Sequence, residues 1–244
     1  MLDNERFQSA CERVLNGEGS GYGIGALSER TLHRILKYYY EPCDDLHEVS
    51  FMGYVADVKN KKGIIEIQTA NPVRLLPKLK AFLSLERTTV VLPLFSKKYI
   101  NTLDKNTGEV VSRRKSPNCD TVYSAFYDLY PLRDLLDNEN LTVKLLFLTA
   151  DVYKTKKTKR YEKTKIDTLP RDLVSEIDIT STQDVARLLP TDLPEEFTRR
   201  ELSKALRLPY RRISYTVGFL QKIGVINLVG KRGREMLYKI NPIT

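Results

Sequence analysis

The sequence contains few of the residues that build disulfide frameworks or zinc sites. Among its 244 residues there are only three cysteines, Cys11, Cys43 and Cys119, and two histidines. An odd number of widely separated cysteines supports neither a disulfide framework nor a zinc knuckle, and it is typical of a reducing cytoplasm. We therefore expect a cytoplasmic protein. We assign no catalytic function to His33 or His47, for which a helix-surface or strand-end position is expected.

Long apolar segments are also absent. No run approaches the roughly 18–20 residues needed to span a bilayer. Residues 1–17 lack the basic and apolar regions of a secretory signal, so we expect no association with a membrane. Hydrophobic residues nevertheless make up 41% of the chain and charged residues 29%. This composition is sufficient for a packed core, and the length suits one large domain or two small ones.

The net charge of +9 is distributed unevenly along the chain. Residues 1–152 are neutral overall, with 20 basic and 20 acidic side chains. A basic segment at 153–165 is followed by an acidic one at 166–197, and residues 198–244 hold 11 basic and 2 acidic side chains. A basic terminal module indicates a polyanionic partner, most often nucleic acid. The alternative is a charged surface that serves only solubility.

Hydrophobic periodicity predicts a mixed α/β domain in the first part of the chain. We expect helices over 28–40, 72–86 and 121–137, and strands over 47–58, 64–69, 88–95 and 141–149. A surface hairpin is expected within 99–115, and the turn-like Asn60–Gly63 tetrapeptide should join two strands into another hairpin. The basic segment 153–165 is either a linker or an exposed strand and loop.

The last part of the chain follows a different pattern. Residues 198–208 predict a short helix in which Thr198 and Glu201 form a capping box. A turn at Pro209 leads into a second helix over 211–223 that ends at Gly224. Residues 225–240 then read as a β-hairpin with a basic tip. Helix, turn, helix and hairpin in this order are the winged helix-turn-helix pattern, with a preceding helix expected near 182–189.

Acidic residues stand at two positions of the first domain where burial is costly. Asp57 and Glu66 belong to strands that are otherwise apolar, and a buried lone carboxylate costs several kcal/mol unless it is paired or binds a metal. If Lys59 pairs with Ile64, Asp57 lies directly opposite Glu66. Two carboxylates at this separation repel each other unless a proton or a cation bridges them, and Mg²⁺ accepts such a geometry. Helix periodicity places Glu29 on the stripe that should face the sheet.

Glu29, Asp57 and the Glu66-Ile67-Gln68 tripeptide together resemble the PD-(D/E)XK, or restriction-endonuclease-like, nuclease superfamily. The resemblance covers roughly residues 20–95. It implies a mixed sheet flanked by helices, with Mg²⁺ or Mn²⁺ held by Asp57, Glu66 and the carbonyl of Ile67, and with Glu29 binding directly or through water. It also implies hydrolysis of phosphodiester bonds, without an organic cofactor.

One residue departs from the usual superfamily pattern. Gln68 occupies the position of the catalytic lysine, which removes a positive charge beside the attacking water. Lys78 or Lys80 on the next helix could supply that charge from another direction. The structural alternative is a hairpin in which Asp57 and Glu66 pair with lysines or arginines at a sheet edge.

The C-terminal unit resembles winged-helix DNA-binding domains, in which the second helix of the motif enters the major groove. The resemblance implies contacts with bases or phosphates from the second helix and the wing, with backbone contacts from the first helix. A winged helix used for protein contacts is the alternative. The expected DNA-binding residues are Arg199, Arg200, Lys204, Arg211, Arg212, Ser214, Tyr215, Lys231, Arg232 and Arg234, with Gln221 as a further candidate.

These patterns together predict an α/β nuclease-like domain over 1–165 and a winged-helix domain over 166–244. The expected function is a divalent-metal-dependent DNA endonuclease, restriction-like or junction-resolving, whose partner is double-stranded DNA. Because cutting both strands needs two active sites, we expect a homodimer. The alternatives are an inactive nuclease fold that acts as a DNA-binding regulator or recombination accessory, and a nuclease directed at RNA.

Overall fold

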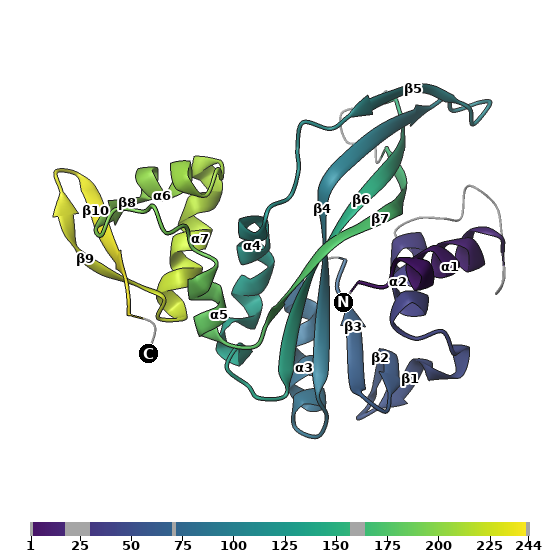
Figure 1. The fold of residues 1–244 in the computed structure, drawn as a ribbon, viewed down its shortest axis with the longest axis horizontal. Coiled ribbons are helices and arrows are strands. Elements are labelled where there is room, and N and C mark those ends of the chain that lie inside the picture. Colours follow the sequence, from purple (N-terminus) through teal and green to yellow (C-terminus); the bar gives the residue numbers. More distant parts are fainter. Residues whose placement is uncertain (1, 18–29, 70–71, 157–163, 243–244) are drawn as a thin grey trace. The chain divides into compact units, whose positions relative to one another are not determined.

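The computed structural model describes residues 2–17, 30–69, 72–156 and 164–242. The chain is an α/β protein in which a large mixed sheet is flanked by helices, as the sequence predicted. Seven strands form this sheet, in the order β1-β2-β3-β4-β6-β7 with β5 paired to β4, and a separate sheet has the order β8-β10-β9 (Figure 1). No helix in these ranges is long and apolar enough to cross a membrane.

The helical elements are spread along the whole chain. The α-helices are α1 Asn4–Leu15, α2 Arg30–Tyr40, α3 Leu76–Leu83, α4 Phe126–Leu129, α5 Thr182–Arg187, α6 Arg199–Ala205 and α7 Tyr210–Lys222. The 3-10 helices are η1 Asp44–Leu46, η2 Pro72–Leu75, η3 Val122–Ala125 and η4 Tyr130–Leu135. The strands are β1 His47–Phe51, β2 Tyr54–Asn60, β3 Gly63–Ile67, β4 Thr88–Leu103, β5 Val110–Lys115, β6 Leu141–Thr155, β7 Lys165–Ile179, β8 Phe197–Thr198, β9 Ile226–Arg232 and β10 Glu235–Ile240.

The single strand predicted over 47–58 was wrong, because the chain reverses in its middle. Phe51 pairs with Tyr54 across a two-residue turn, and both turn residues have positive φ, 52° at Met52 and 77° at Gly53. Positive φ at both central positions is the type I′ geometry that matches the twist of a hairpin. In β2, Ala56 and Val58 are fully buried, whereas Val55 is exposed.

Helix predictions were correct in place but too long in two cases. The helix expected over 28–40 is α2, whose described part begins at Arg30, so the first two residues of the expected helix lie outside the described residues. The segment 72–86 is a 3-10 turn followed by α3, which starts at Leu76 with Pro77 in its first turn. Residues 121–137 form two 3-10 helices around the single turn of α4.

Two compact units divide the chain, and each is built from several segments. Unit 1 comprises residues 1–69, 91–120 and 146–177, and unit 2 comprises 70–90, 121–145 and 178–244. The boundary expected between residues 165 and 166 falls at the start of β7, which continues the large sheet. The basic segment is therefore strand on either side of residues 157–163, which lie outside the described part.

The core of unit 1 lies between the α1–α2 pair and the sheet. Apolar side chains of both helices pack on residues from four strands, among them Ile67, Val91, Leu146 and Leu173. Cys11 of α1 belongs to this core, and its burial raises the pKa of the thiol to about 11. Because the thiolate is the reactive form of cysteine, this thiol should be inert while the core is intact.

Thiol labelling tests that packing. Cys43 and Cys119 are exposed free thiols. At about pH 8, Ellman's reagent should therefore titrate two thiols per chain rapidly and the third, Cys11, only after denaturant is added. The Cys11→Ser variant is the control and should leave the rapid phase unchanged. Three rapid thiols in the native protein would contradict the burial of α1 on the sheet.

The C-terminal segment of unit 2 forms the predicted order of elements. Thr198 caps α6, since its hydroxyl accepts the Glu201 amide and the Glu201 carboxylate accepts the Thr198 amide, which confirms the capping box. Gly224 has φ of 73° and follows Ile223, the C-cap residue of α7, as expected for a helix that ends on glycine. The β9–β10 hairpin then pairs with the short strand β8.

Candidate functional site

The β2–β3 hairpin brings the two predicted acidic residues together. Lys59 pairs with Ile64 and Asn60 with Gly63, which confirms the expected register. Continuing that register places Asp57 opposite Glu66, where side chains share a face about 4.5–5.5 Å apart at Cβ. Glu66 is only 3% exposed, and the Asp57 side chain is 20% exposed. The hairpin therefore holds two neighbouring carboxylates in a largely dry environment.

Each of these carboxylates accepts a backbone hydrogen bond from the opposite strand. The Asp57 amide donates to Oε1 of Glu66 at 3.1 Å, and the Ile67 amide donates to Oδ2 of Asp57 at 2.7 Å. Such charge-assisted bonds fix the orientation of a carboxylate. The side chains thus connect the two strands beyond the last ladder pair and are preorganised relative to each other.

His33 on α2 contacts the same pair of acids. Its Nε2 lies 3.1 Å from Oδ2 of Asp57, and its side chain is 27% exposed. The sequence offered no reason to select this residue, because the contact depends on where α2 crosses the hairpin. The structure therefore adds an imidazole to the candidate site.

One turn further along α2, Lys37 forms an ion pair with β1. Its ammonium lies 2.8 Å from Oε1 of Glu48, and the lysine side chain is only 8% exposed. The hydrogen bond from Lys37 and its positive charge lower the pKa of Glu48, with a further contribution from the charge of His33. The four-residue spacing of His33 and Lys37 puts both on one face of α2.

The remaining predicted site residues have different surroundings. Glu29 lies outside the described residues. Ile67 is buried in the core. The backbone amide of Gln68 donates to the Val91 carbonyl at 2.9 Å, so the backbone of Gln68 continues the pairing with β4. Lys78 and Lys80 belong to α3 in unit 2, where the Lys78 ammonium lies 5.6 Å from the ring centroid of Phe82.

Within the ranges that the structure describes, no group of three or more His, Cys, Asp or Glu side chains is placed to hold a metal ion. The predicted metal site has two of its carboxylates, Asp57 and Glu66, within the described residues. Two carboxylates are a common complement for Mg²⁺, which retains several water ligands.

A second candidate surface lies on the C-terminal elements of unit 2. On α7, Ile213, Val217 and Leu220 are fully buried. The opposite face is solvent-exposed. The exposed predicted DNA-binding residues are Arg200, Lys204, Arg211, Arg212, Ser214, Tyr215, Lys231, Arg232 and Arg234, together with Gln221.

Some of these cations also have partners within the module. Arg232 lies 3.0 Å from Oε1 of Glu201, and Arg199 donates to the Tyr238 hydroxyl at 3.0 Å. Arg199 is only partly exposed. These contacts attach the β9–β10 hairpin to α6, so both arginines contribute to the architecture of the surface.

Tyr215 faces a concave region of unit 2. Its ring packs edge-on against Tyr127 of α4, with centroids 5.3 Å apart, and a buried Phe126–Phe219 contact lies nearby on the same two helices. Tyr215, Tyr127 and Tyr130 line a pocket of about 390 Å³. Tyr215 therefore has an aromatic partner within the protein, although 55% of the residue remains exposed.

Comparison with known proteins identifies the family. A protein from Treponema pallidum (strain Nichols), described as uncharacterized, is 32% identical over 224 residues, which covers 90% of this chain and 88% of the relative. No solved structure matches the chain significantly. The family model described as "Domain of unknown function (DUF8091)" matches residues 30–180, from the start of α2 to the end of β7. The chain therefore belongs to the DUF8091 family.

Proposed function

We propose that the protein is a divalent-metal-dependent endonuclease acting on double-stranded DNA. The observation that carries this proposal is the pair of opposed carboxylates, Asp57 and Glu66, held by reciprocal backbone hydrogen bonds. The order α2, three-stranded meander, α3 and β4 supports it, since it agrees with the motif order of the nuclease resemblance.

The donor set is compatible with Mg²⁺ or Mn²⁺. Both are hard cations that prefer carboxylate oxygens. Asp57 and Glu66 would hold the ion, together with the Ile67 carbonyl and Glu29 as the resemblance implies. When bound, such an ion activates water and stabilises the charge that develops on phosphate. His33 orients Asp57, and Gln68 offers an amide in place of the usual lysine.

The C-terminal elements would deliver this site to DNA as a winged helix. Its recognition surface would be the exposed face of α7 with the β9–β10 wing, where cations gather. Such a module positions itself through phosphates and selects sequence through base edges. A homodimer would supply the second active site needed for double-strand cleavage. Three unpaired cysteines fit a cytoplasmic location.

The direct test is cleavage of supercoiled plasmid by the full chain. With Mg²⁺ or Mn²⁺ we expect nicked or linear product, and with excess EDTA we expect none, because the ion activates the attacking water. A matched reaction on double-stranded RNA separates a DNA nuclease from an RNA nuclease. Absence of metal-dependent cleavage on every substrate would contradict the proposal.

Binding without cleavage is the second candidate function. Two observations favour it: Gln68 replaces the usual lysine, and both Asp57 and Glu66 already accept backbone amides. Salt-sensitive binding of duplex DNA in the absence of any cutting would assign the protein as a regulator or recombination accessory.

A further inference from the structure

A second concentration of positive charge lies on a part of unit 1 distant in sequence from the winged module. The β4–β5 hairpin, residues 97–115, holds six basic side chains and two acidic ones. Every residue of β5 is exposed, and the hairpin forms the outer end of the long strand β4 (Figure 1). The basic side chains are Lys97, Lys98, Lys105, Arg113, Arg114 and Lys115.

Strand register places several of these residues on one face. Tyr99 is opposite Lys115, and Asn101 is opposite Arg113. Because side chains alternate along a strand, Lys97 shares that face. The Arg113 guanidinium lies 4.2 Å from the ring centroid of Tyr99. One face of the hairpin therefore combines three cations with an aromatic ring.

A buried aspartate from β6 holds this face in position. Asp151, whose side chain is 12% exposed, accepts a hydrogen bond from Asn101 at 3.0 Å. Arg113 reaches one of its oxygens at 3.4 Å, and Arg171 of β7 reaches the other at 3.3 Å. Two guanidinium groups around one carboxylate leave a local excess of positive charge.

Both arginines keep donor groups available to solvent. Their side chains are 47% and 48% exposed, and a guanidinium has five N–H donors, of which one carboxylate uses at most two. A fork fixed in this way binds a phosphate group with two parallel hydrogen bonds, at little cost in side-chain entropy. The arrangement is suited to a phosphodiester.

We propose that the face formed by Lys97, Tyr99, Arg113, Lys115 and Arg171, the arm face, binds the backbone of duplex DNA as a second contact surface in addition to the winged module. A two-stranded ribbon fits the major groove of B-form DNA, whereas the major groove of A-form RNA is too narrow for it. This inference rests on the proposed DNA-directed function. It adds that unit 1, which carries Asp57 and Glu66, holds the substrate itself.

The salt dependence of binding tests this proposal. The full chain is titrated with a fluorescent 30-base-pair duplex in EDTA at several salt concentrations. The double variant Lys97→Gln/Lys115→Gln loses two phosphate contacts. The negative slope of log K against log [salt] should therefore become shallower by roughly 1.8, and binding should weaken about 10-fold. Arg113→Lys, which keeps the charge but loses the fork, should weaken binding while leaving the slope nearly unchanged.

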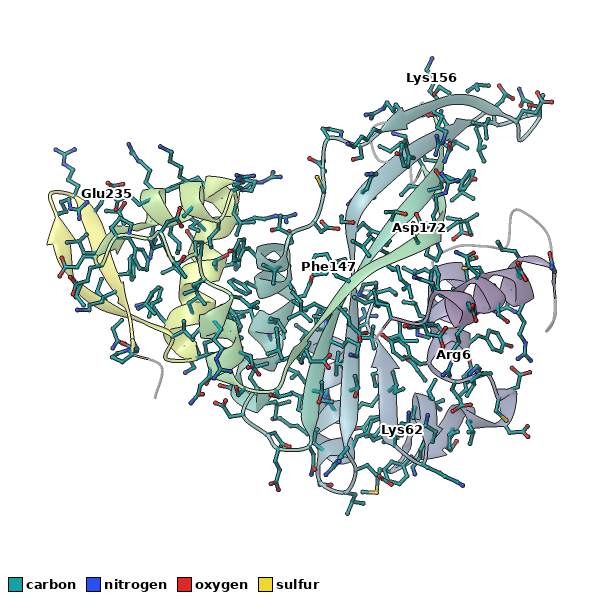
Figure 2. The ribbon with its side chains drawn as sticks, viewed as in Figure 1. Arg6, Lys62, Phe147, Lys156, Asp172 and Glu235 are labelled. Atoms are coloured by element: carbon teal, nitrogen blue, oxygen red, sulfur yellow. The ribbon has the colours of Figure 1, made fainter. Side chains whose placement is uncertain are left out.

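The matched control is Lys61→Gln/Lys62→Gln in the exposed β2–β3 turn, which should bind as the wild type does. Figure 2 shows Lys62 at the opposite end of unit 1 from Lys156 of the β6–β7 end. A wild-type slope in the arm variant, or an equal loss in the control, would overturn the inference.

Other outcomes separate this inference from the proposed function. If the arm variant binds normally while Arg211→Ala/Arg212→Ala binds weakly, the arm face is not a DNA contact and the winged module remains one. If a double-stranded RNA competes as well as DNA, the assignment of duplex DNA to the arm face is wrong. If the wild type binds no duplex, both proposals fail.

Discussion

Replacing Glu66 by glutamine should reduce metal-dependent cleavage by at least about 100-fold while the protein stays folded. Changes in groups that only support a metal ligand already cost 10- to 100-fold, so loss of a ligand's charge should cost more. Glutamine keeps the oxygen that accepts the Asp57 amide, and it removes only the negative charge. The measurement is the initial rate of plasmid nicking across a range of Mg²⁺ concentrations.

Glu41→Gln is the matched control for that experiment. The Glu41 carboxylate of unit 1 also accepts a hydrogen bond from a backbone amide, that of Cys43 at 3.1 Å. It accepts another from the side-chain amide of Asn60. Its replacement should leave the cleavage rate within about twofold. Unchanged cleavage in Glu66→Gln, with a native circular dichroism spectrum in both variants, would remove the Asp57–Glu66 pair from the active site.

Loss of Arg211 and Arg212 should weaken binding of duplex DNA by at least roughly 30-fold, since two contacts are lost and each well-placed contact of this kind contributes about 1–3 kcal/mol. Both residues are exposed in the first turn of α7, whereas the neighbouring Ile213 is fully buried. The double substitution Arg211→Ala/Arg212→Ala therefore leaves the core of the module intact. Fluorescence anisotropy at a fixed salt concentration measures the change.

Lys222→Ala provides the comparison, because this exposed lysine lies at the opposite end of α7. It should reduce affinity far less than the double variant. Equal losses would show that α7 attracts DNA by charge alone, and no loss in the double variant would show that α7 does not contact DNA.

Local sequence signals predicted the β2–β3 hairpin and the C-terminal elements well. The Asn60–Gly63 turn, the Thr198–Glu201 capping box and Gly224 each act within a few residues, so their effect can be derived from spacing alone. The juxtaposition of Asp57 and Glu66 followed from register in the same way.

The β1–β2 turn and β7 were not predictable by that reasoning. Non-glycine residues such as Met52 rarely adopt positive φ, so no local signal in the sequence indicated that the chain reverses there. β7 contains Pro170 and many charged residues, which argue against a central strand. It is the last strand of the sheet, where proline is tolerated because one edge needs no ladder partner.

The contacts of His33, Lys37 and Asp151 depend on tertiary structure. His33 meets Asp57 because α2 crosses the hairpin, and Asp151 meets Arg113 and Arg171 because three strands converge. No spacing rule gives such contacts, since each joins segments that are distant in the chain. The arm face could therefore not be predicted from the sequence.

The segments of the two units alternate along the chain, and this determines the order in which the units can be completed during synthesis. Unit 1 needs residues up to 177 before its sheet is complete, and unit 2 includes residues 70–90, which leave the ribosome much earlier. Segments 70–90 and 121–145 are therefore synthesised before residues 178–244 can complete unit 2. Leu79, Phe82 and Phe126 are fully buried in the folded chain, so we expect these apolar side chains to need protection by chaperones until the rest of unit 2 has been synthesised.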